Sequence, residues 1–215
     1  MRVEVKVCGL TRAADAQAAA ELGARYVGAI FAGGPRAVEP SRAREVLDGA
    51  GAGVERVGVF GRSSVETIAA TVREARLDIV QLHADPGAVD VRAIREASGA
   101  RVWAVVRVDG ALDTTTLREL WDAADAVVLD SKVKGMLGGT GESFRWSAAE
   151  RATRARLGPL VVAGGLTASN VAEAIETLSP EVVDVSSGVE SSPGIKDHKL
   201  LADFIGAVRR TGVVR

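Results

Sequence analysis

The chain has 215 residues, of which 47% are hydrophobic and 26% charged, and this composition excludes extended disorder and predicts a packed core in one domain spanning residues 1–215. Its 27 Lys and Arg residues nearly balance 28 Asp and Glu residues, so the net charge of −1 argues against nucleic acid or an anionic membrane as the main partner. The single cysteine, Cys8, excludes an internal disulfide and a thiolate metal site. No apolar stretch approaches the ~18 residues of a membrane span, and the first residues lack the apolar block of a signal peptide, so we expect a cytoplasmic protein.

Strand-like and helix-like segments alternate along the chain. Short β-branched runs, typical of parallel strands covered on both faces, occur at residues 3–7, 26–31, 55–60, 79–82, 101–107, 126–129, 160–163 and 182–185. Between them, Ala-rich amphipathic stretches predict helices that include residues 12–22, 64–75, 89–98, 115–123 and 170–178. Ser63 and Glu66 have the spacing of a capping box, and Gly23 and Gly99 stand where helices need C-caps.

The number of repeating units indicates the architecture. Eight strand–helix units in 215 residues leave about 27 residues for each, close to the minimum for a strand, a helix and two turns. A doubly wound open sheet would show the same alternation. The count and the length, which lies within the ~200 to more than 400 residues of known barrels, favour an α/β fold of the (β/α)8 (TIM) barrel type in one compact domain. The long irregular stretch 131–146 is expected to be a functional lid or a disordered insertion.

Two glycine-containing segments follow the seventh and eighth predicted strands. Barrels often bind phosphate in these two loops, where glycines let backbone N–H groups approach an anion. The segments AGGL (163–166) and SSG (186–188) supply the candidates, which are Gly164, Gly165, Ser186, Ser187 and Gly188. Each glycine alone is better explained as part of a tight turn. Their joint occurrence at the two expected places predicts a phosphate site.

Polar residues at other strand ends are candidates for catalysis. Cys8 follows the first strand, with Lys6 two residues before it, and a thiolate there could act as a base. A lone cysteine is more often a small buried hydrophobe. Asp130 follows the sixth strand and is the matching acid candidate, although carboxylates at strand ends also cap helices or bind lysines. Because strand ends converge on one mouth, a thiol and a carboxyl there suit proton transfer at two faces of a substrate.

Three further residues lie at strand ends. Gln81 and His83 stand at the end of the fourth strand, and an isolated histidine there is more often a polar residue that closes the strand. Arg36 follows the second strand, directly after Pro35, although it could be one of many solvated arginines. The segment GGTG (138–141) has neither the spacing nor the strand–turn–helix context of a dinucleotide-binding motif.

Together these residues lie in motifs that resemble the phosphoribosylanthranilate isomerase family. The similar segments follow the family's order over residues 3 to about 205: KVCGLT (6–11), GPR (34–36), VGVF (57–60), VQLH (80–83), LD (129–130), GGTGESFRW (138–146), AGGL (163–166), ASNV (168–171) and DVSSGVESSPGIKDH (184–198). The first and last of these segments are specific together.

The resemblance implies a cofactor-free and metal-free Amadori rearrangement of a small phosphorylated substrate. By position in the motifs, Asp130 is the general acid that opens the ribose ring and Cys8 the general base that takes the C2 proton. Arg36 then holds the anthranilate carboxylate, for which a planar guanidinium is well suited. The other substrate contacts are Gln81 and His83, and the phosphate contacts are Gly164, Gly165, Ser186, Ser187 and Gly188. The assembly is expected to be a monomer or a homodimer, with neither a nucleic acid nor a membrane as partner.

The thiol imposes one requirement on its surroundings. A free thiol has a pKa of about 8.5, and Lys6 or a local positive field is expected to lower the pKa of Cys8 modestly.

The departures from the family pattern are Arg145 in place of Asp, Ala84 in place of Gly, and Ala37 in place of an aromatic residue. The first puts lid closure in doubt, and the last is expected to loosen packing around the anthranilate ring.

Other interpretations remain open at this point. Related barrels, such as another aminoaldose isomerase or the indole-glycerol-phosphate synthase, are expected to use two aspartates or a lysine–glutamate set, and Cys8 argues against them. A non-catalytic sensor of phosphorylated ligands would keep the phosphate segments, but it would need neither Cys8 nor Asp130.

Overall fold

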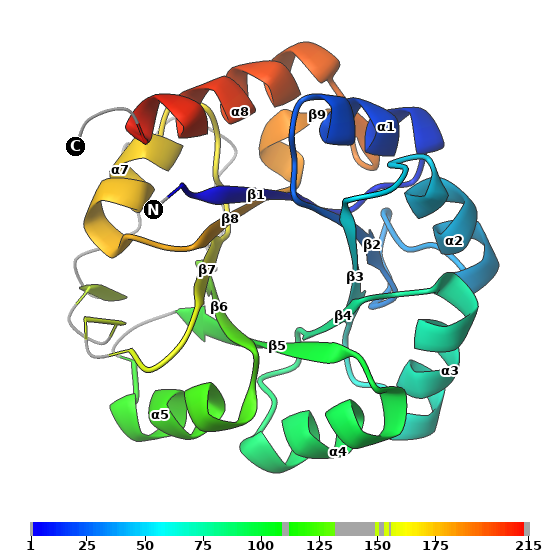
Figure 1. The fold of residues 1–215 in the computed structure, drawn as a ribbon, viewed down its shortest axis with the longest axis vertical. Helices are drawn as coiled ribbons and strands as arrows, with labels where there is room; N and C mark the ends of the chain where they lie inside the picture. The colour runs from blue at the N-terminus through cyan, green and yellow to red at the C-terminus, as the bar shows by residue number, and fades with distance from the viewer. Residues whose placement is uncertain (1, 109–111, 132–148, 151–152, 155, 213–215) are drawn as a thin grey trace.

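In the computed structural model, eight parallel strands close into a barrel in the order β1 to β8, and helices surround it (Figure 1). The structure describes residues 2–108, 112–131, 149–150, 153–154 and 156–212. The predicted (β/α)8 architecture is confirmed. The predicted lid, apart from the backbone of residue 131, and the departure Arg145 lie outside the described residues.

The barrel strands are β1 Glu4–Val7, β2 Tyr26–Ile30, β3 Glu55–Phe60, β4 Ile79–Leu82, β5 Arg101–Val108, β6 Ala126–Ser131, β7 Leu160–Ala163 and β8 Val182–Val185. The described helices are α1 Ala13–Glu21, α2 Pro40–Asp48, α3 Val65–Ala75, α4 Ala88–Ser98, α5 Thr114–Ala123, α7 Val171–Leu178 and α8 His198–Thr211. After β8 come a short 3₁₀ helix, η1 Ser187–Val189, and a small antiparallel hairpin of β9 Glu190–Ser192 and β10 Ile195–Lys196.

Strand side chains alternate between two apolar layers. Those that point inward form one cluster: Tyr26, Val57, Ile79, Trp103, Val105, Ala126, Val128, Val161, Ala163 and Val182. The rings of Tyr26 and Trp103 meet edge to face there, with centroids 5.1 Å apart. The second, larger cluster lies between the strands and the helices. Because both faces of each strand are buried, the strands read as continuous apolar runs in the sequence.

Pairing of β1 with β8 closes the barrel. Lys6 stands opposite Asp184 in this pairing, and Val7 stands opposite Val185. The first and last thirds of the chain therefore meet along one seam. Residues at the carboxyl ends of both strands consequently share one side of the mouth.

Helix ends follow the predicted chemistry, with one error. Helix α3 begins after Ser64, whose Oγ accepts a hydrogen bond from the Thr67 N–H at 3.2 Å, so the predicted capping box of Ser63 with Glu66 is displaced by one residue. Both serines have capping chemistry, and the extended backbone at position 64 decides between them. Gly99 caps α4 with φ 69°, as predicted, whereas the C-cap of α1 is Leu22, and Gly23 with φ 92° is the residue after that cap.

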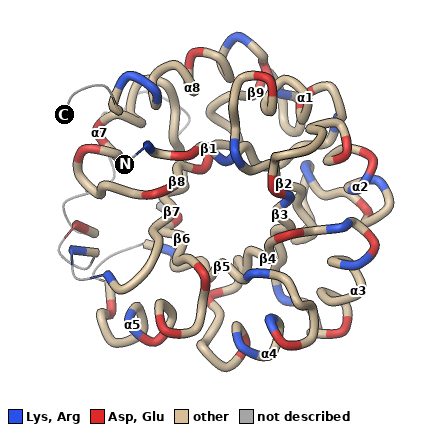
Figure 2. Tube along the Cα trace, in the orientation of Figure 1, with Lys and Arg blue, Asp and Glu red and all other residues tan. Residues whose placement is uncertain are grey.

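Charged residues of both signs are interspersed around the helical ring (Figure 2). This distribution agrees with the small net charge of −1. Within the described part of the chain, none of the helices combines the length and the apolarity needed to cross a bilayer.

Candidate active site

Cys8 lies at the barrel mouth, directly after β1. Its backbone N–H donates a hydrogen bond to the Val185 carbonyl at 2.9 Å, which joins the ends of β1 and β8. Its side chain is buried beside that of Lys6, because both point inward from β1. Gly28 on β2 leaves room for this pair, since a Cβ at that position would approach the Cys8 Sγ to 3.2 Å.

Lys6 is fully buried and carries its charge into the barrel interior. Its Nζ donates to the Asp184 Oδ2 at 2.8 Å. Burial alone would lower the pKa of Lys6, but Asp184 and Cys8 raise the pKa overall, so the ammonium stays charged. The neighbouring sulfur therefore faces a cation that is already paired with a carboxylate.

The pKa of the Cys8 thiol is raised, not lowered. Burial is the main cause, Lys6 opposes it only in part, and Asp184 adds to the rise. Lys6 acts in the expected direction, but the expected net lowering of the Cys8 pKa is wrong, because desolvation disfavours the thiolate more than the paired cation favours it. In this structure the thiol is protonated at neutral pH.

Arg36 lies on the same side of the mouth, near Gly9 and Ser186, which follow β1 and β8. A Cβ at Gly9 would meet the Arg36 Cδ at 2.8 Å and the Ser186 Oγ at 2.9 Å. The guanidinium is bound by Glu190 on β9, with the Arg36 Nη2 donating to Oε2 at 2.6 Å and Nε to Oε1 at 2.9 Å. Glu190 also accepts from the Lys196 Nζ at 2.9 Å. Arg36 is therefore a residue held in place, not a free surface arginine.

His83 and Asp130 form the other group at the mouth. Asp130 belongs to β6, and His83 directly follows β4. The His83 Nε2 lies 3.1 Å from the Asp130 Oδ2, and both side chains are partly exposed. Beside them, Arg107 stands opposite Asp130 in the β5–β6 pairing, and its Nε donates to Asp85 at 2.9 Å. The acid candidate is thus solvent-accessible and lies next to an imidazole nitrogen.

Two polar atoms remain unsatisfied inside the barrel. Within the part of the chain that the structure describes, the buried Gln81 Oε1 and Asp184 Oδ1 have no hydrogen-bond partner. Both side chains point inward, below the level of Cys8 and Asp130. A buried acceptor without a partner is costly, so these two atoms are suited to receive donors from a ligand.

The two glycine-containing segments pack against each other. A Cβ at Gly188 would overlap the Leu166 carbonyl oxygen, so the turn after β8 approaches the one after β7 as closely as only glycine permits. Gly164 and Gly165 have φ values of 91° and 62°, and the space beside Gly165 is open. The Asn170 side chain donates to the Gly165 carbonyl at 3.1 Å and holds this turn in shape.

Ser186 and Ser187 begin the turn after β8, and Ser187 opens η1. The Ser186 carbonyl accepts from the Lys196 Nζ at 3.1 Å. The structure thus brings together both predicted phosphate segments, Cys8 and Arg36 along the ends of β1, β2, β7 and β8.

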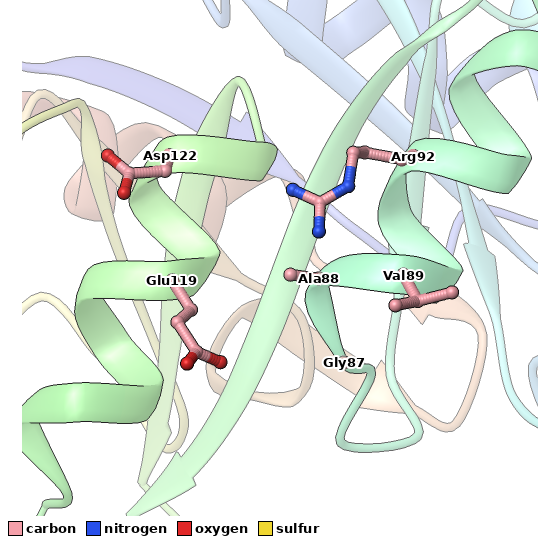
Figure 3. A pocket seen from close by; sticks show the side chains of 6 residues that line it. All are labelled: Gly87, Ala88, Val89, Arg92, Glu119 and Asp122. Carbon is pink, nitrogen blue, oxygen red and sulfur yellow. The ribbon is translucent and has the colours of Figure 1, made fainter.

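A surface cavity lies between two of the outer helices. This cavity of about 480 Å³ lies between α4 and α5 and is lined by Gly87, Ala88, Val89, Arg92, Glu119 and Asp122 (Figure 3). Figure 3 shows Arg92 from one helix facing the acidic side chains of the next. None of the candidate site residues lines it. Among the described residues, no group of three or more His, Cys, Asp or Glu side chains is arranged to hold a metal ion.

A family model described as N-(5'phosphoribosyl)anthranilate (PRA) isomerase matches residues 5–207. The chain belongs to the PRA isomerase family. The N-(5'-phosphoribosyl)anthranilate isomerase of Acidithiobacillus ferrooxidans is 40% identical over 97% of this chain and 98% of its own, and that of Rubrobacter xylanophilus is 41% identical over 96% and 98%.

Solved structures of PRA isomerases have the same fold. The crystal structure from Thermotoga maritima has a TM-score of 0.85 at 35% identity and covers 97% of this chain and 99% of its own. That from Thermus thermophilus has a TM-score of 0.83 at 31% identity, with 96% and 98% covered. A further PRA isomerase, with a TM-score of 0.79, 32% identity and coverage of 97% and 99%, is in complex with reduced 1-(o-carboxyphenylamino)-1-deoxyribulose 5-phosphate.

Membership of the PRA isomerase family makes the chain an isomerase of tryptophan biosynthesis. Of the departures from the family pattern, Ala37 forms an isolated bridge with Ile30 of β2, so the chain after Arg36 returns to the barrel edge. Ala84 follows His83 directly, before the turn at Asp85, whose φ is 50°.

Sequence reasoning missed Glu190 and Lys196 as members of the site. Both lie within the DVSSGVESSPGIKDH segment. The charges of these two residues marked them as candidates for the site, but no local sequence pattern indicated that Arg36 lies in the same cluster.

Proposed function

We propose that the chain catalyses the cofactor-free Amadori rearrangement of N-(5-phosphoribosyl)anthranilate to 1-(2-carboxyphenylamino)-1-deoxyribulose 5-phosphate. The observation that carries the proposal is the shared barrel mouth. Cys8 after β1 and Asp130 of β6 are carried by strands three places apart around the ring, and Arg36 and the two glycine-containing segments lie on the Cys8 side. This arrangement supports transfer of protons at two faces of one anchored substrate.

Asp130 is proposed as the general acid. It donates its proton to the ribose ring oxygen, the C1–O bond breaks, and the nitrogen lone pair forms the C1=N bond of an iminium ion. His83, whose Nε2 lies 3.1 Å from Asp130, can share this proton and orient the carboxyl group. His83 therefore has a role beside its proposed contact with substrate.

Cys8 is proposed as the general base. The thiol first loses its own proton to solvent, and the thiolate then takes the C2 proton, while the electrons of the C–H bond form C1=C2 and neutralise the iminium nitrogen. The resulting enol becomes the ketone when C1 gains a proton and the C2 hydroxyl loses one. Since burial raises the pKa of the resting thiol, the iminium charge beside the sulfur is what favours the thiolate during the reaction.

The remaining residues are proposed to bind the substrate. Arg36 binds the aryl carboxylate, and Gln81 Oε1, which lacks a partner among the described residues, accepts from a sugar hydroxyl. The phosphate lies against the turns that contain Gly164, Gly165, Ser186, Ser187 and Gly188. A cytoplasmic location, the single domain, and a monomeric or homodimeric state stay predictions from the sequence.

The test follows the fluorescence of freshly made phosphoribosylanthranilate, which decays as the anthranilate-type substrate is converted. We expect Cys8→Ser and Asp130→Asn each to lose about 10²–10⁴-fold in kcat/KM, the range for one positioned proton-transfer group. Asp122→Asn on α5, outside the mouth, is the matched control and should keep full activity. If the wild-type protein gives no decay but binds the reduced product analogue, the chain is a binding protein, and the proposal is wrong.

A further inference from the structure

Glu190 is the centre of a buried charge cluster at the barrel mouth. Only 4% of its side chain is exposed, whereas 25% of the Arg36 side chain is accessible and Lys196 is fully buried. The carboxylate receives hydrogen bonds from Arg36 Nε at 2.9 and 3.0 Å, Arg36 Nη2 at 2.6 Å and Lys196 Nζ at 2.9 Å. The Gly194 N–H adds a contact at 3.3 Å. Glu190 is therefore fully engaged within the protein and is not available to a ligand.

The contact geometry leaves one edge of the Arg36 guanidinium unused. Arginine carries five N–H donors in a rigid planar fork. Glu190 takes the edge formed by Nε and Nη2. Among the described residues, no hydrogen bond involves Nη1, so the edge formed by Nη1 and the second Nη2 hydrogen remains for a second planar carboxylate.

Lys196 connects this cluster to the predicted phosphate segment. Its Nζ donates to both Glu190 and the Ser186 carbonyl, at 2.9 and 3.1 Å. Burial lowers the pKa of Lys196, and the contact with Glu190 opposes that effect. The carboxylate of Glu190 thus keeps two cations close together at a fixed distance from the turn after β8. This couples the position of Arg36 to that turn.

We propose that Glu190 is a positioning residue that holds one edge of the Arg36 guanidinium so that the opposite edge binds the aryl carboxylate of the substrate. The inference rests on the proposed function, in which Arg36 binds that carboxylate. Because Glu190 already holds the guanidinium in place, Arg36 loses less rotamer entropy on binding the substrate than a free arginine would. Glu190 therefore determines selectivity for aromatic amines that carry an ortho carboxylate.

If Glu190 acted only by neutralising the charge of Arg36, its removal would change ligand affinity in the opposite direction. If Glu190 only reduced the positive potential at Arg36, its removal would strengthen the binding of every anion. If Glu190 positions the fork, its removal weakens only those ligands that have the carboxylate. Two ligands that differ in this one group separate these effects.

The experiment titrates two probes, reduced 1-(o-carboxyphenylamino)-1-deoxyribulose 5-phosphate and the same compound without the ring carboxylate. We expect the wild-type protein to prefer the first. In Glu190→Gln this preference should fall by about tenfold, the effect of a lost charged hydrogen-bond pair, while the affinity for the second probe changes little. In turnover, KM should rise more than kcat falls.

Two further variants keep the result interpretable. Glu45→Gln removes the carboxylate of an exposed pair with Arg42 on α2 and should leave both affinities unchanged. Glu190→Asp keeps the charge beside Lys196 but retracts it from Arg36, so it should lose part of the preference for the carboxylated probe. It should also remain folded if Glu190→Gln does not.

The outcomes distinguish the two hypotheses. If the wild-type protein binds both probes equally, Arg36 does not bind the aryl carboxylate. Both the proposed substrate contact and this inference then fail. If the wild-type protein prefers the carboxylated probe and folded Glu190 variants keep or increase that preference, the inference alone is overturned.

Discussion

Lys6 shows how a single buried charge shapes this site. A lysine in a barrel interior is costly unless a partner compensates for the lost hydration. Asp184, which stands opposite it across the β1–β8 seam, is that partner at 2.8 Å. Burial outweighs the lowering by Lys6, and Asp184 adds to the rise, so the pKa of Cys8 lies above its ordinary value. The base must therefore gain its driving force from the charge that develops on the substrate.

Gly188 is a residue whose missing side chain brings the two phosphate segments together. In Gly188→Ala the new methyl group would overlap the Leu166 carbonyl, so the turns must separate. We expect a loss of about 1–3 kcal/mol in the free energy of unfolding, as for other overpacked sites, and weaker binding of inorganic phosphate. Urea unfolding and phosphate inhibition measure the two effects.

Gly206 offers a control for that substitution. It lies within α8, and a Cβ there meets only the flexible end of Arg210 at 3.5 Å. Gly206→Ala should therefore be neutral or stabilise the protein by about 0.5–1 kcal/mol, because glycine is unfavourable inside a helix. If both alanine variants bind phosphate like the wild type, the turns do not form the phosphate site as proposed.

At the scale of elements, Asp15 of α1 ties three segments together. Its carboxylate, which is fully buried, accepts from the Arg12 Nη2 at 2.7 Å and contacts the His198 Nε2 at 2.9 Å. It also accepts from the backbone N–H of Lys196 at 3.1 Å. Asp15 thus fixes β10 and the start of α8 against α1. Since Lys196 then holds Glu190, this outer contact supports the charge cluster at the mouth.

The pH dependence of stability follows from Asp15. Burial alone would raise the pKa of Asp15, but hydrogen bonds from Arg12 and His198 lower it overall. A carboxylate with a lower pKa in the folded state stabilises the protein above its unfolded pKa of about 3.9, and this contribution is lost as the pH falls. Asp15→Asn should therefore cost roughly 2–3 kcal/mol at neutral pH and clearly less near pH 3.

Urea unfolding at both pH values measures this difference. Asp203→Asn, which removes an exposed pair with Lys199 on α8, is the control and should change stability by less than about 1 kcal/mol. An equal loss for Asp15→Asn at both pH values would mean that the ionised carboxylate does not supply the stability.

At the scale of the whole molecule, closure makes the interior and the helical layer depend on each other. Every barrel strand pairs with two neighbours, and β1 pairs with both β2 and β8. The strands contribute one set of side chains to the interior cluster and the other set to the layer under the helices. Loss of one strand therefore opens the ring and exposes both layers.

This predicts that the helices and the interior unfold together. In the double variant Trp121→Phe, Trp146→Phe, Trp103 is the remaining tryptophan, and its ring lies inside the barrel. We expect the urea midpoint of its fluorescence to coincide with the midpoint of the far-UV circular dichroism of the same protein, which reports the helices. Two separated midpoints would show that part of the ring unfolds independently and would contradict the single domain.

The amino-acid sequence by itself determined the order of the eight barrel strands and of the helices predicted between them. The runs at 55–60, 79–82, 160–163 and 182–185 coincide with β3, β4, β7 and β8, because a doubly buried strand needs a continuous apolar run, which is a local property. Once eight such units close, the carboxyl ends of all strands converge. That rule places Cys8, Asp130 and the glycine-containing turns at one mouth without any coordinates.

The tertiary structure alone decided which charges meet and how much water surrounds them. Arg36 and Glu190 are separated by 154 residues in the chain, and the Lys6–Asp184 pair by 178. No local periodicity encodes such pairs, because they depend on the closure of the ring and on the path of the hairpin after β8. The pKa of Cys8 rises for the same reason, since desolvation depends on every strand that packs around the sulfur.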